Sequence, residues 1–257
     1  MFQCKLHEAI VLKKIVEAIK DVVNSVNIDA SPQGLAFQAM DLSHVALVTL
    51  SLRSEGFASY KADKSFPLGV KLQNLHKILK CADNADMVTM ECEDEPQQLQ
   101  FKFESQKQDR TTRLTLNLMQ NDEDQLAIPE TNYSSNITMP SSEFSRIVRE
   151  LSQLSETVKV RTTKKAIYFS VDGDIGKGEM ELKENTSDKP TEKIEIDVDD
   201  EVEASFSLTF LNSFCKGGAL SDSVRLLMSE NTPLVVEYKI GDLGTLKYYL
   251  APKLQDD

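Results

Sequence analysis

Short stretches of alternating apolar and polar residues dominate the chain. Between Val26 and Leu52 the alternation is interrupted by SPQG and DLSH, which have the composition of turns. Similar runs recur along the rest of the sequence: DMVTMECE, QLQFKFES, RLTLNLM, TVKVRT, AIYFSVDG, KIEIDV, VRLLMSE, LVVEYKI and LKYYLA. Many short strands with few helices predict an antiparallel, sheet-rich fold of the α+β class.

Four segments have instead the 3.6-residue apolar period of an amphipathic helix. Their apolar stripes run from Leu12 to Val23, from Leu72 to Leu79, from Phe144 to Leu154 and from Leu208 to Cys215. Ser141 precedes the third stripe and is a candidate N-cap. Gly217 and Gly218 are expected to end the fourth helix.

The four helical segments form two pairs. An offset of 132 residues places Lys14 on Arg146, and an offset of 136 residues places Lys80 on Lys216. At these offsets the apolar positions of one segment meet those of its counterpart. A general likeness between any two α+β halves would be the simpler explanation, but two nearly equal offsets favour two copies of one domain. We predict an N-terminal domain, an interdomain connector and a C-terminal domain at residues 1–118, 119–135 and 136–257.

The polar faces of these helices are basic, although the chain has a net charge of −12. That net charge argues against binding nucleic acid through overall charge. The basic residues on the four faces are Lys13, Lys14, Lys20, Lys77, Lys80, Arg146, Arg149 and Lys216. For any one helix, a solvated surface is the simpler interpretation. If all four faces converge, their charge favours a polyanion that is contacted through phosphates without base readout.

Catalytic, metal and membrane signals are weak in this sequence. The four cysteines form no CxxC pair and predict buried thiols in a reducing compartment, and His7, His44 and His76 lie outside zinc and hydrolase motifs. GDIGKGEM lacks the order of a phosphate loop, and DVDDE lacks EF-hand spacing. No apolar run approaches about 18 residues, and the N-terminus lacks signal-peptide features. We expect no enzymatic activity, no cofactor, no metal and no membrane association.

Five longer segments occur in the order MDLSHVALVTLSLRSEGF, GVKLQNLHKILKCADNAD, SEFSRIVRELSQLSE, VDGDIGKGEMELK and PLVVEYKIGDLGTLKYYLAPKL. Together they resemble the proliferating cell nuclear antigen family of eukaryotic DNA sliding clamps, and the resemblance runs from Met1 to the acidic C-terminus without a large insertion. It implies two similar clamp domains per chain, each with antiparallel sheets outside and two helices inside. Three such chains are expected to form a ring, with the helices lining its central hole.

The resemblance also implies roles for particular residues. The eight basic residues named above match the cations that line the hole in this family, and residues 61–80 match the segment usually assigned to DNA binding. A pocket for partner peptides is implied at Met40, His44, Val45, Leu47, Leu126, Ile128, Tyr133, Pro233, Tyr249, Ala251 and Pro252. Subunit contacts are implied on one edge at Arg110, Leu114 and Leu116, and on the other edge at Gly178 and Met180. Lys164 matches the family's ubiquitin-acceptor lysine.

The function implied by the resemblance is topological. A homotrimeric ring would encircle duplex DNA without sequence specificity, act as a processivity factor for a replicative DNA polymerase, and serve as a docking platform. Expected partners are the clamp loader and other replication, repair and translesion-synthesis proteins that have a clamp-binding peptide motif, and the expected location is the nucleus. The alternatives are a checkpoint-type clamp subunit of a mixed ring and a protein scaffold without a DNA role. Ala127 and Asn117 depart from some relatives, which have a modification site and a basic residue at these positions.

Overall fold

The structure is a computed structural model that describes residues 1–94, 96–120, 126, 128, 131–185, 187, 189 and 192–253. The chain forms two compact units. The first consists of Met1–Leu42, Val48–Leu126 and Ile240–Leu246, and the second of Ser43–Leu47, Ala127–Lys239 and Lys247–Asp257. We assign each helix or strand to the unit that holds most of its residues.

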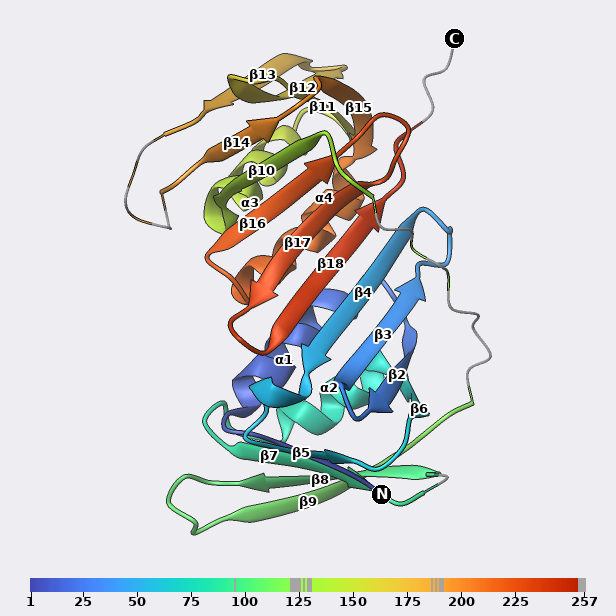
Figure 1. Cartoon of the computed structure of the whole chain (residues 1–257). Coiled ribbons are helices and arrows are strands. Elements are labelled where there is room, and N and C mark those ends of the chain that lie inside the picture. Colours follow the sequence, from blue (N-terminus) through green and yellow to red (C-terminus); the bar gives the residue numbers. More distant parts are fainter. Residues whose placement is uncertain are drawn as a thin grey trace. The chain divides into compact units, whose positions relative to one another are not determined.

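The first unit has two helices against two groups of paired strands (Figure 1). Strands β5-β1-β7-β8-β9 form one sheet, and β4-β3-β2-β6 are neighbours in that order in another. The elements are β1 (Phe2–Leu6), α1 (Ala9–Ile19), β2 (Ser25–Ser31), β3 (Gly34–Met40), β4 (Ala46–Arg53), the 3-10 helix η1 (Ser54–Gly56), β5 (Ser59–Ala62), β6 (Phe66–Lys71), α2 (Leu72–Lys80), β7 (Met87–Cys92), β8 (Gln98–Glu104) and β9 (Thr111–Asn117).

The second unit repeats this arrangement. Strands β14-β10-β16-β17-β18 are neighbours in that order, and β13-β12-β11-β15 form a separate sheet. The elements are β10 (Ser135–Pro140), α3 (Ser141–Leu151), β11 (Thr157–Thr162), β12 (Ala166–Gly173), β13 (Gly176–Lys183), β14 (Glu195–Val198), β15 (Val202–Ser207), α4 (Leu208–Phe214), the 3-10 helix η2 (Cys215–Ala219), β16 (Ser223–Met228), β17 (Leu234–Ile240) and β18 (Gly244–Leu250).

Backbone hydrogen bonds repeat at the offsets seen in the sequence. The Ala9 N–H donates to the Asp86 carbonyl at 2.7 Å, and the Ser141 N–H donates to the Asp222 carbonyl at 2.9 Å. The donors are 132 residues apart and the acceptors 136, so each first helix is joined in the same way to the loop after the second helix. Two copies of one α+β domain are therefore confirmed.

Each unit has its own apolar core because the helical stripes face the sheets. Ile15 and Ile19 of α1 are buried, as are Phe144 and Ile147 of α3. The Phe144 ring packs against Phe169 of β12 with the ring centroids 6.5 Å apart. Burying one such side chain contributes about 1.5–3 kcal/mol, which is more than helix propensity supplies.

Several sequence expectations need correction at the ends of helices. Val22 lies beyond α1, because the chain turns after Ile19 and the Val22 N–H bonds to the Ile19 carbonyl at 3.0 Å. Ser141 is the first residue of α3 and makes no side-chain cap; Pro140 occupies the cap position. The last predicted helix continues beyond Phe214 as the 3-10 helix η2. Cys81 is exposed at the end of α2, contrary to the expectation that the thiols are buried.

None of the helices in the described ranges is long and apolar enough to cross a membrane. Within the connector expected at residues 119–135, residues 121–125, 127, 129 and 130 lie outside the described residues, as does the end of the C-terminal domain from Leu254 onward.

Candidate nucleic-acid and partner interfaces

The basic residues of α1 are tied to nearby acceptors. The Lys13 ammonium donates to the Ala82 carbonyl and to Asn84 Oδ1, at 3.1 Å for Asn84. Lys20 lies 3.3 Å from Glu17 and 3.4 Å from Asp21. Partial burial opposes a rise in the pKa of Lys20, but the two carboxylates outweigh it and raise the pKa. These lysines are positioned by the protein before any ligand arrives.

A second link joins the two helices of the first unit. His76 Nδ1 on α2 lies 3.3 Å from Glu17 Oε2 on α1. The helices pack against each other, so this contact fixes the polar surface between them. Lys77 and Lys80 are exposed in the last turn of α2, where the negative end of the helix dipole favours cations.

The basic residues of α3 differ from one another. Arg146 is held between Glu143 and Glu150, with its Nη1 3.1 Å from Glu150 Oε2. The hydrogen bond with Glu143 is the main cause of the raised pKa of Arg146. Arg149 is exposed one turn further along, and Lys216 of η2 is exposed as well. Arg146 therefore has its charge largely balanced, whereas Arg149 presents its charge to solvent.

The predicted cations lie on the helices of both units, as the sequence indicated. Lys14 is half-buried, and the other seven are half-buried or exposed. Lys20 is the C-cap residue of α1, and the rest lie on α1, α2, α3 and η2. Each unit thus has basic residues on both of its helical segments. The convergence of the four helix faces on one surface stays a prediction.

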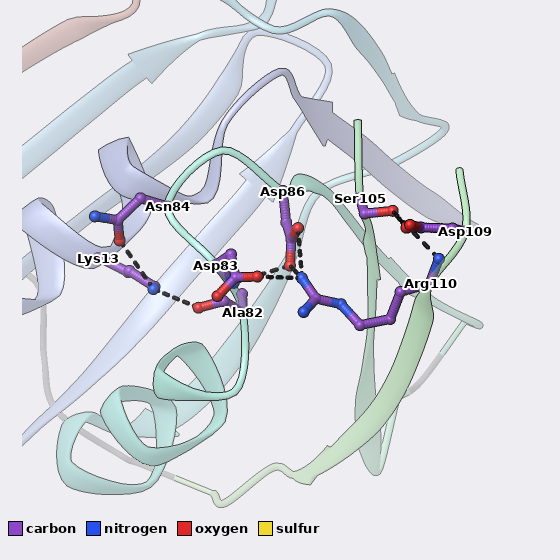
Figure 2. Close-up of polar contacts among 8 residues, drawn as sticks. All are labelled: Lys13, Ala82, Asp83, Asn84, Asp86, Ser105, Asp109 and Arg110. Atoms are coloured by element: carbon purple, nitrogen blue, oxygen red, sulfur yellow. Dashed lines mark hydrogen bonds and ion pairs between the residues drawn. The ribbon is translucent and has the colours of Figure 1, made fainter. Parts of the chain in front are cut away.

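Arg110 joins the β9 strand to the loop after α2 (Figure 2). Its Nη2 lies 2.9 Å from Asp86 Oδ1 and 3.0 Å from Asp86 Oδ2, and it also bonds Asp83. The hydrogen bonds with Asp83 and then Asp86 raise the pKa of Arg110. The Asp86 side chain is 5 % exposed and also accepts the Asp83 N–H at 2.8 Å. The family resemblance implies a subunit contact for Arg110, and this local role has no signal in the sequence.

The segments expected to form subunit contacts include strands at sheet edges. Strand β9 is the last in the order β5-β1-β7-β8-β9, and β13 is the first in β13-β12-β11-β15. Leu114, Gly178 and Met180 are half-buried, so their side chains or backbone reach the surface. Leu116 is buried in its own unit, which leaves its backbone for an edge contact. An edge strand has unpaired N–H and C=O groups that another strand can pair with.

The residues expected to form the partner-peptide pocket are distributed over both units, and we describe each part by itself. In the first unit, Gln38 Nε2 donates to the Leu126 carbonyl at 2.8 Å, and the Leu126 side chain is 47 % exposed. Met40 is half-buried. This contact fixes the backbone of Leu126 beside β3 and leaves its apolar side chain accessible.

In the second unit, the Ala251 N–H donates to the Val45 carbonyl at 3.0 Å. Burial raises the pKa of Tyr133, and Tyr249 contributes to the same shift. The side chain of Ile128 is 39 % exposed. The other predicted pocket residues are half-buried or exposed: His44, Leu47, Pro233 and Pro252. Apolar side chains at the surface are suited to binding a peptide, and the pocket as a whole stays a prediction.

Lys164 lies in the turn between β11 and β12 and is exposed. The Thr163 hydroxyl oxygen accepts the N–H groups of Lys165 and Ala166, which closes the turn. The described residues contain no group of three or more His, Cys, Asp or Glu side chains that could hold a metal ion.

Comparisons with known proteins cover the whole chain. The family described as "Proliferating cell nuclear antigen, N-terminal domain" matches residues 1–126, and "Proliferating cell nuclear antigen, C-terminal domain" matches residues 127–253. The chain is similar to the proliferating cell nuclear antigen of Chaetomium thermophilum, with 46 % identity over 258 residues. That alignment covers 100 % of both sequences.

Proposed function

The chain belongs to the proliferating cell nuclear antigen family, and we propose that it is a DNA sliding clamp without enzymatic activity. Three copies form a ring around duplex DNA in the nucleus and act as a processivity factor for a replicative polymerase. The observation that supports this most strongly is the full-length similarity to a named clamp, which includes both domains. Residues 1–118 and 136–257 are the two clamp domains of each copy, joined by the connector at 119–135.

We place the DNA contacts on the helices. Eight basic residues on α1, α2, α3 and η2 face phosphates in the central hole, while the acidic remainder of the chain discourages binding outside it. Phosphate contacts have no sequence information, so the ring slides. Encirclement supplies retention, and the individual contacts can remain weak.

The ring closes through strands β9 and β13. One subunit offers the β9 edge with Arg110, Leu114 and Leu116, and the next offers the β13 edge with Gly178 and Met180. A head-to-tail contact between two different surfaces closes into a ring when the rotation allows it. The assignment is supported by the sheet topology, in which β9 and β13 are each the edge strand of a sheet.

The native mass tests the proposal. At micromolar concentration we expect three times the 28.8 kDa mass of one chain. Met180→Arg should reduce that mass by placing a charge at the subunit edge, while Lys177→Arg on the same strand should leave it unchanged. A monomer for the unsubstituted chain would contradict the ring, and an unchanged mass for Met180→Arg would contradict the assignment of the β13 edge to the subunit contact.

We further propose that partner proteins, including the clamp loader and repair and translesion polymerases, dock a short peptide motif on the predicted pocket. The exposed side chains of Leu126 and Ile128 support this, because buried apolar anchors dominate peptide binding. Replacing both with alanine should reduce peptide affinity at least about tenfold. The charge-neutral exchange Asn132→Ala in the same connector is the control, and retained affinity in the Leu126/Ile128 variant would move the docking site elsewhere.

We also propose Lys164 as a ubiquitin acceptor, because it is exposed in a turn.

A further inference from the structure

In the first unit, a lysine side chain occupies a site formed by acceptor groups of the loop after α2. The Lys13 side chain on α1 reaches the loop after α2, where its ammonium donates to the Ala82 carbonyl and the Asn84 side chain (Figure 2). Carbonyl groups just beyond the end of a helix have partial negative charge. This loop position is therefore built to hold an ammonium group.

The second unit has the same backbone but lacks this lysine. At the repeat offsets, Ser145 stands in place of Lys13 and Gly218 in place of Ala82. The helix start is joined to the following loop as in the first unit, through the Ser141 N–H and the Asp222 carbonyl at 2.9 Å. The position that receives an ammonium in the first unit has no cationic side chain at the matching place in the second.

A cavity of about 270 Å³ lies at this position, which we call the α3 cavity. Its size is well above the roughly 10–15 Å³ that one water molecule needs. Its lining residues are Ser141, Ser142, Ser145, Cys215, Gly218, Ser221 and Asp222. Because residue 218 has no side chain, the cavity is open beside Ser141; a Cβ atom there would lie 3.3 Å from the Ser141 Cβ.

One lining group is buried without a partner in the described part of the chain. The Ser141 side chain is 5 % exposed, and its hydroxyl oxygen makes no hydrogen bond among the described residues. Buried hydroxyls almost always have a partner, because leaving one unpaired is unfavourable. This group therefore indicates that a ligand belongs in the cavity.

The charges in the α3 cavity favour a cation over an anion. The N-terminus of α3 would attract an anion, but its first N–H is already donated to the Asp222 carbonyl. The acidic residue Asp222 is one of the lining residues and is exposed, and burial raises the pKa of Cys215 to about 12, despite an opposing hydrogen bond with Ser145, so this thiol stays neutral. Serine hydroxyls and a glycine carbonyl accept the N–H groups of an ammonium.

We propose that the α3 cavity binds the primary ammonium group of an aliphatic amine, with a polyamine as the ligand class. The ammonium occupies the place of the Lys13 ammonium and contacts the Ser141 hydroxyl and the Asp222 carboxylate. A lysine side chain of another protein offers the same chemistry. The site lies within one unit and does not depend on ring formation.

Amide chemical shifts of the full-length protein test the site directly. Methylammonium should shift the amides of Ser142, Ser145 and Gly218, and spermidine should do so at lower concentration. Tetramethylammonium has no N–H donor and should leave these amides unchanged at the same ionic strength. Equal shifts with tetramethylammonium would mean diffuse electrostatics, and shifts with inorganic phosphate but not with methylammonium would mean an anion site. Either result would overturn the proposal.

Substitutions test whether the ammonium takes the place of Lys13. Ser145→Lys should abolish the methylammonium response and raise the melting temperature by about 2 °C, because the chain then supplies its own cation. Gln153→Lys adds the same charge outside the cavity and should preserve the response. Asp222→Asn should weaken amine binding about tenfold, as expected for loss of one charge-assisted hydrogen bond. An unchanged response in both Ser145→Lys and Asp222→Asn would exclude this cavity.

To separate a polyamine from a partner's lysine, spermidine should be compared with a lysine-containing peptide such as acetyl-Gly-Lys-Gly-amide. We expect spermidine to bind more tightly, because either of its two primary ammonium groups can enter the cavity, whereas the peptide has only one. Tighter binding of the peptide would assign the cavity to a protein partner and overturn the choice of a polyamine.

Discussion

The two units use the same backbone junction with opposite side-chain chemistry. In the first unit, the aspartate of the junction, Asp86, is buried and held by Arg110, and Lys13 fills the adjacent position. In the second unit, Asp222 is exposed and Ser145 borders a cavity. The backbone hydrogen bond from the helix start is present in both. The backbone bond is therefore common to both copies, whereas the side chains around it differ between them.

The largest expected effect is on stability, at the two matching aspartates Asp86 and Asp222. Asp86→Ala should lower the free energy of unfolding by about 2–3 kcal/mol, because the change removes a buried acceptor of charged hydrogen bonds and leaves the Asp83 N–H without its partner. Asp222→Ala at the matching position should change it by less than about 0.5 kcal/mol, as expected for an exposed site.

Urea unfolding, followed by amide hydrogen exchange to locate the loss, measures both variants. Loss of protection in the Asp86 variant should be confined at first to β7, β9 and the loop after α2. Equal destabilisation by the two substitutions would show that the junctions are energetically alike and would contradict the comparison.

A smaller difference is expected in how much the basic residues of the two units contribute to DNA binding. Lys77 and Lys80 are exposed, whereas Arg146 is held by two glutamates. Counted for each subunit that contacts the DNA, replacing both lysines with alanine should reduce the slope of log affinity against log salt by about 2, because two phosphate contacts are lost, and it should weaken binding at least about tenfold. Arg146→Ala should change the slope by less than 1.

The measurement is binding of linear duplex DNA to the ring across a range of salt concentrations. Arg149→Ala is the matched control on α3, because its side chain is exposed and should lower the slope by about 1. Equal slopes for Arg146→Ala and the double lysine variant would mean that ion pairing within the helix does not reduce DNA contact.

The helices and most strands could be predicted from the sequence because their apolar periods are long and regular. TVKVRT and AIYFSVDG coincide with β11 and β12. The pairing of Arg110 with Asp83 and Asp86 could not be predicted, because the residue that precedes β9 meets a loop at least 24 residues away through tertiary packing. The bend after Ile19 was missed for a similar reason: Val22 and Val23 continue the apolar period although the helix has ended.

The basic residues of the candidate site could be predicted from the sequence, but the groups with which they form hydrogen bonds could not. Helical periodicity placed basic residues on all four helical segments. It gave no sign that Lys13 turns toward the Ala82 carbonyl, because the acceptor is a backbone group with no sequence signature. The α3 cavity was missed for the converse reason, since a serine in place of a lysine is unremarkable until its copy in the other unit is compared.

The smallest expected effect is that of Lys13→Ser, which gives the first unit the residue of the second. It should lower the free energy of unfolding by about 1 kcal/mol, the usual contribution of one hydrogen bond, because the Ala82 carbonyl and Asn84 lose a charged donor. Lys14→Ser removes the same charge from the next position and should have a smaller effect. Urea unfolding measures both.

The Lys13→Ser variant also tests whether the site left by the Lys13 ammonium binds an added ammonium, or whether the nearby Arg110 prevents this. If the site binds an ammonium, methylammonium should shift the Ala82 and Asn84 amides in Lys13→Ser and restore the lost stability, because the ligand replaces the missing donor. If Arg110 repels the added cation, the stability loss should persist at any amine concentration, since Arg110 contacts Asp83 and Asp86 of the same loop. Restoration would show that both copies of the junction bind ammonium and that only the first supplies its own, and its absence would restrict the amine site to the α3 cavity.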